Sequence, residues 1–143
     1  MDSATKREII LDNYSNPYHK GTEGTDGYIK VNSNNESCID NIDLYIKIED
    51  DVITDIKFDG EACAISTAST SIMIKNLIGK NINEILTYIE NFNNMLEEKP
   101  YEDTDFDEAV VFDETYKQAN RKTCVTLPYK GIEKAIKEYI TNK

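Results

Sequence analysis

Residues 41–60 read NIDLYIKIEDDVITDIKFDG, and this stretch decides the fold. Apolar side chains stand at every second position of its first half: Ile42, Leu44, Ile46 and Ile48. After the acidic pair Asp50 and Asp51, the alternation resumes with Val52, Thr54, Ile56 and Phe58. A period of two places one set of side chains on one face of a strand, so each half is typical of a strand with one buried face. The stretch therefore predicts two antiparallel strands joined by a turn at the acidic pair.

The segments on either side of this hairpin complete a mixed fold. Residues 27–33 are typical of a further strand, and three strands in succession favour an antiparallel meander. Helical periodicity marks residues 4–14, 64–78 and 82–96, and a last helix that has Pro128 in its first turn. We therefore predict an α+β fold, a three-stranded antiparallel sheet with helices packed on one face. Residues 1–143 should form a single domain.

Charge and composition narrow the class of partner. The formal net charge is −11, which argues against nucleic acid and anionic membranes as partners, because both repel an acidic surface. No apolar run approaches the ~20 residues of a membrane span. The first residues lack the basic start and apolar core of a signal peptide, so we expect a cytoplasmic protein.

Residues 97–114 form an unusually acidic segment, with nine acidic residues and one basic residue. Four apolar residues are interspersed among the charges: Phe106, Val110, Val111 and Phe112. One interpretation is a solvated surface loop with some local packing. The other is a docking surface for a basic partner. The sequence leaves both open.

The chain contains three cysteines: Cys38, Cys63 and Cys124. Their odd number argues against a disulfide framework, and their spacing alone is weak evidence for a metal, since an isolated cysteine is often a small buried hydrophobe. Cys63 and Cys124 each precede a predicted helix, where free N–H groups favour a thiolate. Cys38 is followed two residues later by Asp40, in a loop between strands. Three thiols and one carboxylate could converge on a tetrahedral metal.

Several motifs in order resemble those of the U-type iron–sulfur assembly proteins, the IscU/SufU/NifU-N family. The resemblance runs from about Ile9 to Ile136. The motifs that carry it are Asn16-Pro17 with Lys20-Gly21, Cys38-Ile39-Asp40, the segment from Phe58 to Ser66 around Cys63, Gly79-Lys80, and Arg121-Lys122-Thr123-Cys124. The chain is most similar to the SufU branch. It has a long segment between the second and third cysteines, which makes residues 97–114 an insertion, and it has Thr123 where scaffold-type members carry a histidine.

The resemblance implies a zinc-dependent sulfurtransferase that accepts persulfide sulfur from a PLP-dependent cysteine desulfurase and serves downstream iron–sulfur assembly proteins. It implies Zn²⁺ bound by Cys38, Asp40, Cys63 and Cys124. We assign Cys38 as the sulfur acceptor, because it sits in a polar loop that can reach outward, and Asp40 as the metal ligand most easily displaced. Arg121 is a supporting residue that would favour thiolate or guide the persulfide, although a surface arginine is an equal alternative.

Two other functions remain possible at the level of sequence. The first is a scaffold protein that assembles and transfers a [2Fe–2S] cluster on the same residues, which the scaffold branch of the family implies. The second is a structural zinc domain with no role in sulfur chemistry.

Overall fold

The computed structural model describes residues 1–35 and 39–143. In chain order its elements are α1 (Ser3–Ser15), β1 (Ile29–Asn34), β2 (Asn41–Glu49), β3 (Val52–Glu61), α2 (Ala64–Leu77), α3 (Ile82–Leu96), the short 3-10 helices η1 (Asp107–Phe112) and η2 (Thr115–Lys117), and α4 (Ala119–Thr141). The predicted helices and strands are all present, and most of their ends are shifted by a few residues, but the last helix begins well before Pro128.

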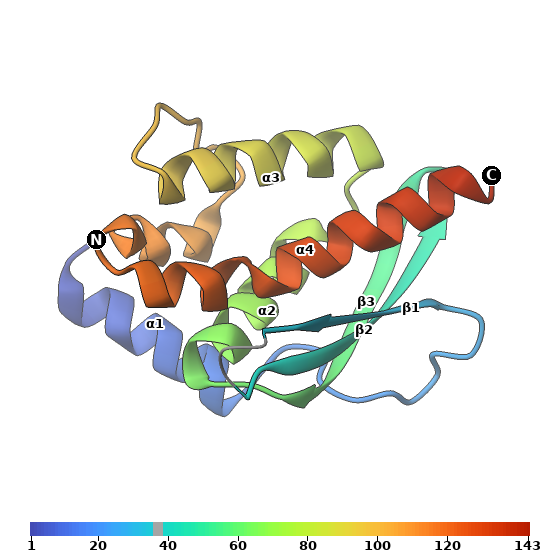
Figure 1. The fold of residues 1–143 in the computed structure, drawn as a ribbon, viewed down its shortest axis with the longest axis horizontal. Helices are drawn as coiled ribbons and strands as arrows, with labels where there is room; N and C mark the ends of the chain where they lie inside the picture. Colours follow the sequence, from blue (N-terminus) through green and yellow to red (C-terminus); the bar gives the residue numbers. More distant parts are fainter. Residues whose placement is uncertain (36–38) are drawn as a thin grey trace.

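The three strands form an antiparallel sheet in the order β1-β2-β3, so the predicted fold class is confirmed. The helices gather on one side of the sheet, and the long α4 crosses it directly (Figure 1). Ile42, Leu44 and Ile46 of β2 point into the buried layer between them. The sheet therefore supplies one wall of the core and the helices supply the other.

The alternation in β3 differs from the prediction at one point. A register shift follows Lys47 in β2, and Thr54 of β3 lies between the paired residues Ile53 and Asp55, opposite no partner. This β-bulge changes which side chains face the core, because one extra residue reverses the alternation. Ile53 is consequently fully buried and Thr54 is exposed, the reverse of the sequence pattern.

Local signals set the helix boundaries near the sheet. Asn81 and Glu84 form the capping box expected from their spacing, since each side chain accepts a hydrogen bond from the other residue's backbone N–H. Gly131 lies in the middle of α4, and a Cβ there would collide with the side chain of Leu44. The absence of a side chain at this position lets α4 pack directly against β2.

The start of α4 is a second departure from the prediction. The helix begins at Ala119, so Cys124 lies within it rather than ahead of it, and Pro128 lies in its interior rather than in its first turn. Proline has no backbone N–H, so it interrupts the helical hydrogen-bond ladder one turn back, at the carbonyl of Cys124. The sequence pattern placed the start of the helix at this proline because proline is most often found in a first turn.

The acidic segment 97–114 packs against the core through its apolar side chains. Phe106, Val111 and Phe112 are buried, and Phe106 packs edge-on against Tyr88 and Phe92 of α3. Seven of its acidic residues are exposed: Glu97, Glu98, Glu102, Asp103, Asp105, Asp107 and Glu114. The segment thus has a packed apolar side and an acidic outer side. Within residues 1–35 and 39–143, no helix is both long and apolar enough to cross a membrane.

Candidate metal centre

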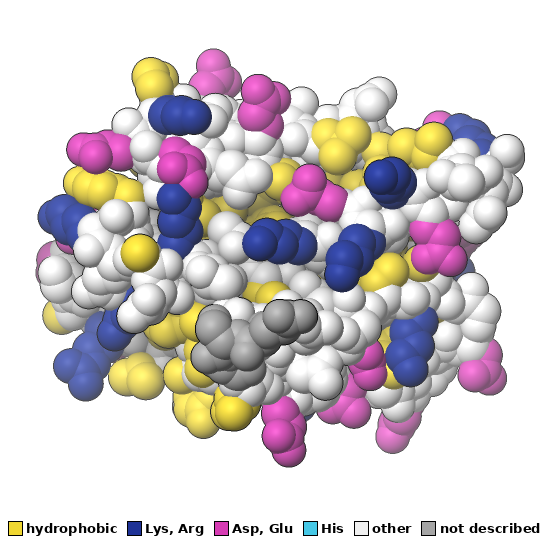
Figure 2. Space-filling model, in the orientation of Figure 1, with side chains coloured by type: hydrophobic (Ala, Val, Ile, Leu, Met, Phe, Trp, Pro, Cys, Tyr) yellow, Lys and Arg dark blue, Asp and Glu magenta, His cyan; other side chains and the backbone are white. Residues whose placement is uncertain are grey.

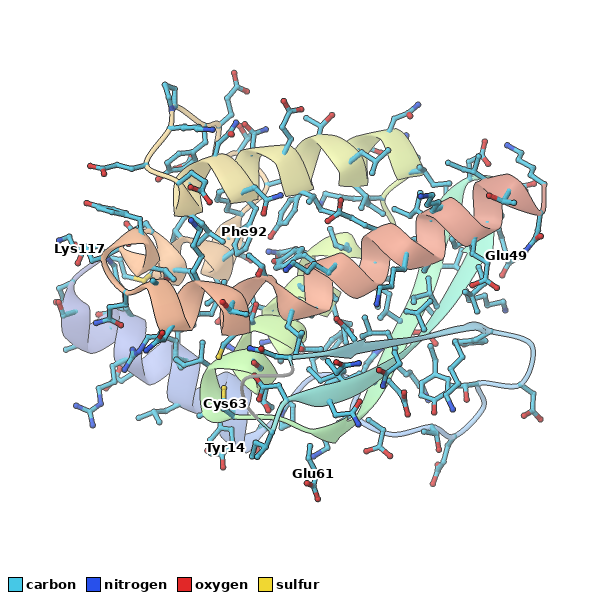
Figure 3. The ribbon with its side chains drawn as sticks, in the orientation of Figure 1. Tyr14, Glu49, Glu61, Cys63, Phe92 and Lys117 are labelled. Atoms are coloured by element: carbon cyan, nitrogen blue, oxygen red, sulfur yellow. The ribbon has the colours of Figure 1, made fainter. Side chains whose placement is uncertain are left out.

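Three of the predicted metal ligands come together at one end of the sheet. Asp40 precedes β2, Cys63 precedes α2, and Cys124 lies in α4, yet their ligand atoms all lie within 4.8 Å of one another. Figure 3 shows Cys63 at the start of α2, beside the end of the sheet. Cys38, the fourth predicted ligand, lies outside the described residues, so its place in the site stays a prediction.

Cys63 is the N-cap of α2, as its position in the sequence predicted. Its backbone is extended, and its Sγ accepts a hydrogen bond from the backbone N–H of Ser66 at 3.4 Å. The positive end of the helix dipole lies at this sulfur and favours a negative charge there. Cys63 is therefore held in place by the backbone of the helix that it caps.

Asp40 is held in place through both oxygens of its carboxylate. Its Oδ1 accepts the backbone N–H of Cys63 at 2.6 Å, and its Oδ2 accepts the hydroxyl of Ser66 at 2.6 Å. The residue is only 1% exposed. A buried carboxylate with two such charge-assisted hydrogen bonds has little freedom to turn. Whether Asp40 is the metal ligand most easily displaced stays a prediction.

Cys124 completes the described part of the cluster. Burial, and then the neighbouring Cys63, raise the pKa of the Cys124 thiol to about 12. The cause is physical: a second negative charge next to Cys63 and the buried Asp40 would be costly in a site partly screened from water. Cys124 lies in the second turn of α4 and not ahead of its first residue. The predicted helix-start effect therefore does not operate at this cysteine.

The sulfur and carboxylate donors of the site are ligands that a divalent cation such as Zn²⁺ prefers. Ligands at about 2.0–2.3 Å from a tetrahedral zinc ion lie roughly 3.3–3.8 Å from one another. Cys63 Sγ lies 3.7 Å from Asp40 Oδ2, within that range. Two sulfurs and one carboxylate oxygen suit Zn²⁺ and also suit iron in a cluster. The described residues thus supply three donors in a geometry that a tetrahedral metal could occupy.

Ser66 is a site residue that the sequence analysis did not single out, although its hydroxyl contacts Asp40. The available signal was the spacing from Cys63 to Ser66, which is the spacing of an N-cap residue to the third residue of a helix. A serine at that position faces back toward the cap, and so toward Cys63, which forms it.

Arg121 lies in the first turn of α4, three residues before Cys124, and is exposed. It lines a groove of about 640 Å³ between α1 and the start of α4, together with Lys6, Arg7 and Lys117. Figure 2 shows basic and hydrophobic side chains next to one another at this end of the molecule. The groove also contains Ala64, which follows Cys63, so the cations lie beside the candidate metal centre.

Comparison with known proteins places this geometry in a family. The family described as NifU-like N terminal domain matches residues 5–143. The zinc-dependent sulfurtransferase SufU of Bacillus subtilis strain 168 is 37% identical over 131 residues, which cover 91% of this chain and 88% of that protein. The iron–sulfur cluster assembly scaffold protein IscU of Thermotoga maritima is 32% identical over 131 residues, which cover 92% of each.

A solved structure extends the likeness to three dimensions. It is described as an iron–sulfur cluster assembly scaffold protein for the SUF system of Fervidobacterium islandicum AW-1. It superimposes with a TM-score of 0.80 at 34% identity, covering 90% of this chain and 93% of that one. Sequence, fold and the convergence of Asp40, Cys63 and Cys124 agree, and the chain belongs to the NifU-like N-terminal domain family of SufU-type and IscU-type proteins.

Proposed function

We propose that the protein is a zinc-dependent sulfurtransferase in iron–sulfur cluster assembly, which accepts persulfide sulfur from a PLP-dependent cysteine desulfurase. The observation that carries the proposal is the convergence of Asp40, Cys63 and Cys124 within 4.8 Å. The similarity to the Bacillus subtilis zinc-dependent sulfurtransferase supports it. Cys38, which precedes Asp40 by two residues in the sequence, is the fourth ligand and the sulfur acceptor in this proposal.

The transfer itself needs only one thiolate on this chain. The thiolate of Cys38 attacks the outer sulfur of a persulfide on the donor enzyme, and a new S–S bond forms at Cys38. The S–S bond of the donor breaks, and its electron pair leaves with the donor cysteine as a thiolate. The sulfane sulfur keeps its oxidation state, so no external oxidant or reductant is required.

A bound Zn²⁺ supplies a positive charge that keeps the cysteine ligands deprotonated at neutral pH. Asp40 is fixed by the N–H of Cys63 and the hydroxyl of Ser66, and Cys63 is fixed as a helix cap. Asp40 and Cys63 therefore keep their positions while Cys38, the sulfur acceptor, reacts with the donor persulfide.

Two features support docking of a separate protein beside the site. The exposed carboxylates of segment 97–114 offer a surface for basic groups, and Arg121 lines a groove next to the cysteines that also contains Lys6, Arg7 and Lys117. In the proposed function the desulfurase meets the acidic surface, and Arg121 guides the anionic persulfide. Downstream iron–sulfur assembly proteins would then collect the sulfur from the same end of the molecule.

The second candidate is a scaffold that assembles and transfers a [2Fe–2S] cluster. It is favoured by the similarity to the Thermotoga maritima IscU protein and by a donor set that also suits iron. In that case iron and sulfide are the substrates, and the purified protein would be brown after reconstitution with both.

The test combines a desulfurase assay with mass spectrometry. Cysteine and a PLP-dependent cysteine desulfurase are incubated with and without this protein, and alanine release is measured. We expect turnover to rise and a mass increase of one sulfur atom to map to Cys38, while Cys38→Ser removes both effects. A persulfide on Cys124 with Cys38 unmodified would overturn the acceptor assignment. Unchanged turnover with no added sulfur on any cysteine would overturn the sulfurtransferase.

A further inference from the structure

Ser66 connects the three described members of the metal centre. It lies in the first turn of α2 and is fully buried. Its Oγ lies 2.6 Å from Asp40 Oδ2, 3.1 Å from the carbonyl oxygen of Cys124 and 3.5 Å from Cys63 Sγ. One hydroxyl thus contacts a residue from each of the three segments that build the site.

The distances indicate how the hydroxyl is used. A hydroxyl has one proton to donate and two lone pairs that accept. Asp40 is the nearer acceptor and carries the charge, so it takes the stronger hydrogen bond from Ser66. The carbonyl of Cys124 shares the same proton at the longer distance, and it is open to Ser66 because Pro128 has no N–H to offer it. The thiol of Cys63 can donate to the same oxygen.

The hydrogen bond from Ser66 does not compete with a metal for Asp40. A carboxylate oxygen can accept a hydrogen bond and coordinate a cation at the same time, because it has more than one lone pair. Partners that hold a metal-binding side chain from behind usually raise metal affinity, since the ligand is already oriented when the metal arrives. With its other oxygen bound by the N–H of Cys63, Asp40 then keeps one orientation.

We propose that Ser66 is the positioning residue of the metal centre: its buried hydroxyl orients the Asp40 carboxylate and so sets how tightly the site holds a divalent cation. This inference rests on the metal site of the proposed function but not on sulfur transfer. Ser66 acts through Asp40 and does not itself bind the metal.

The chain offers a matched control in Ser69, one turn further along α2. Ser69 is also fully buried, and its hydroxyl donates to the carbonyl of Val125 at 2.6 Å. Both serines therefore tie α2 to consecutive residues of α4, but only Ser66 contacts Asp40. A loss that comes from weakening the α2–α4 contact should appear in Ser69→Ala as well as in Ser66→Ala.

The first experiment measures the affinity for Zn²⁺ by competition with a chromophoric chelator. We expect Ser66→Ala to weaken zinc binding by about 10–100-fold, the usual loss when a partner behind a metal ligand is removed. Ser69→Ala should bind zinc as the wild type does, and Ser66→Thr, which keeps a hydroxyl, should recover most of the affinity. Wild-type affinity in Ser66→Ala, or an equal loss in Ser69→Ala, would overturn the proposal.

A double-mutant cycle tests whether Ser66 acts through Asp40. If it does, Ser66→Ala should cause little further loss of zinc affinity in a chain that already carries Asp40→Asn. If the losses of zinc affinity in the two single variants add in full in the double variant, Ser66 does not act through Asp40 and the positioning role is overturned. The comparison stays informative even if one single variant is less stable than the wild type. The absorption spectrum of the Co²⁺-loaded protein should change in Ser66→Ala and not in Ser69→Ala.

These measurements separate the inference from the function on which it rests. A protein that binds zinc in the manner described but accepts no sulfur would contradict the sulfurtransferase and leave the role of Ser66 intact. A wild-type protein that binds no Zn²⁺ would overturn both.

Discussion

Pro128 lies one helical turn after Cys124 in α4, and the carbonyl that it leaves without a backbone donor accepts the hydroxyl of Ser66 at 3.1 Å. Proline in a helix interior costs about 3 kcal/mol relative to alanine, because it removes a hydrogen bond and crowds the preceding turn. The chain carries this cost next to its candidate metal ligands. The interruption allows a side chain of α2 to bond to the backbone of α4 at the site.

Replacing this proline should stabilise the metal-free protein. In Pro128→Ala the new N–H would pair with the carbonyl of Cys124. The free energy of unfolding should rise by about 1 kcal/mol. The gain is smaller than the full cost of a helical proline, because the change also loses the packing of the proline ring and makes the unfolded chain more flexible. Urea unfolding followed by circular dichroism measures the change. Ala135→Ser, at a buried site of the same helix, serves as a control that should lose stability. A less stable Pro128→Ala protein would contradict the account of the interrupted helix.

The metal should be zinc, with one ion per chain in a colourless protein. Cys63→Ser should lose this ion, because it removes one of the sulfur donors that converge at the site. Its thermal midpoint should fall to that of wild-type protein treated with a chelator. Elemental analysis of both proteins measures the metal. A wild-type protein without zinc, or one that is brown with two irons per chain, would contradict the zinc assignment.

The acidic outer side of segment 97–114 should steer a desulfurase to the protein. Changing Glu102, Asp103, Asp105 and Asp107 to their amides should slow association and flatten its dependence on salt, since exposed charges act mainly on the encounter rate. The fold should survive, because the anchoring side chains such as Phe106 are untouched. Stopped-flow mixing at low and high salt measures the rates.

A charge-matched control keeps this test specific. Glu23, Asp26, Glu133 and Glu138 are also exposed and lie in other parts of the chain, so their conversion to amides changes the net charge equally. If both quadruple variants slow association to the same extent, only the overall charge matters. If neither does, segment 97–114 is a solvated surface with a packed underside and no docking role.

The sequence predicted the fold well because its strongest signals are local. The alternation in β2 and the capping box at Asn81 depend on neighbouring residues, and both appear in the structure. The bulge at Thr54 could not be predicted, since a reversal of the buried face in β3 depends on how the strand pairs with β2. The start of α4 was missed because Pro128 is most often found in a first turn, and only tertiary contacts make it acceptable inside a helix.

The site was predictable in part. The resemblance to known motifs identified Asp40, Cys63 and Cys124, and the structure brings these residues together. Ser66 was missed because a serine near a helix start has an ordinary explanation in helix capping. Its contacts with Asp40 and Cys124 join three segments that are distant in sequence, and such contacts follow only from the packed fold.

Gly131 should be required for the close packing of α4 on the sheet. In an exposed helix, Gly→Ala stabilises by roughly 1 kcal/mol, but here the added methyl would collide with the side chain of Leu44 and touch Ser33. We therefore expect Gly131→Ala to destabilise the protein by about 1–3 kcal/mol in urea unfolding, the usual cost of overpacking. Lys130→Ala, at the exposed neighbouring position, should change stability little.

If the collision is the cause, combining Gly131→Ala with Leu44→Val should cost less stability than the sum of the two single changes, because the shorter side chain makes room for the added methyl. A stabilising Gly131→Ala, or full additivity in the pair, would show that α4 does not depend on this contact.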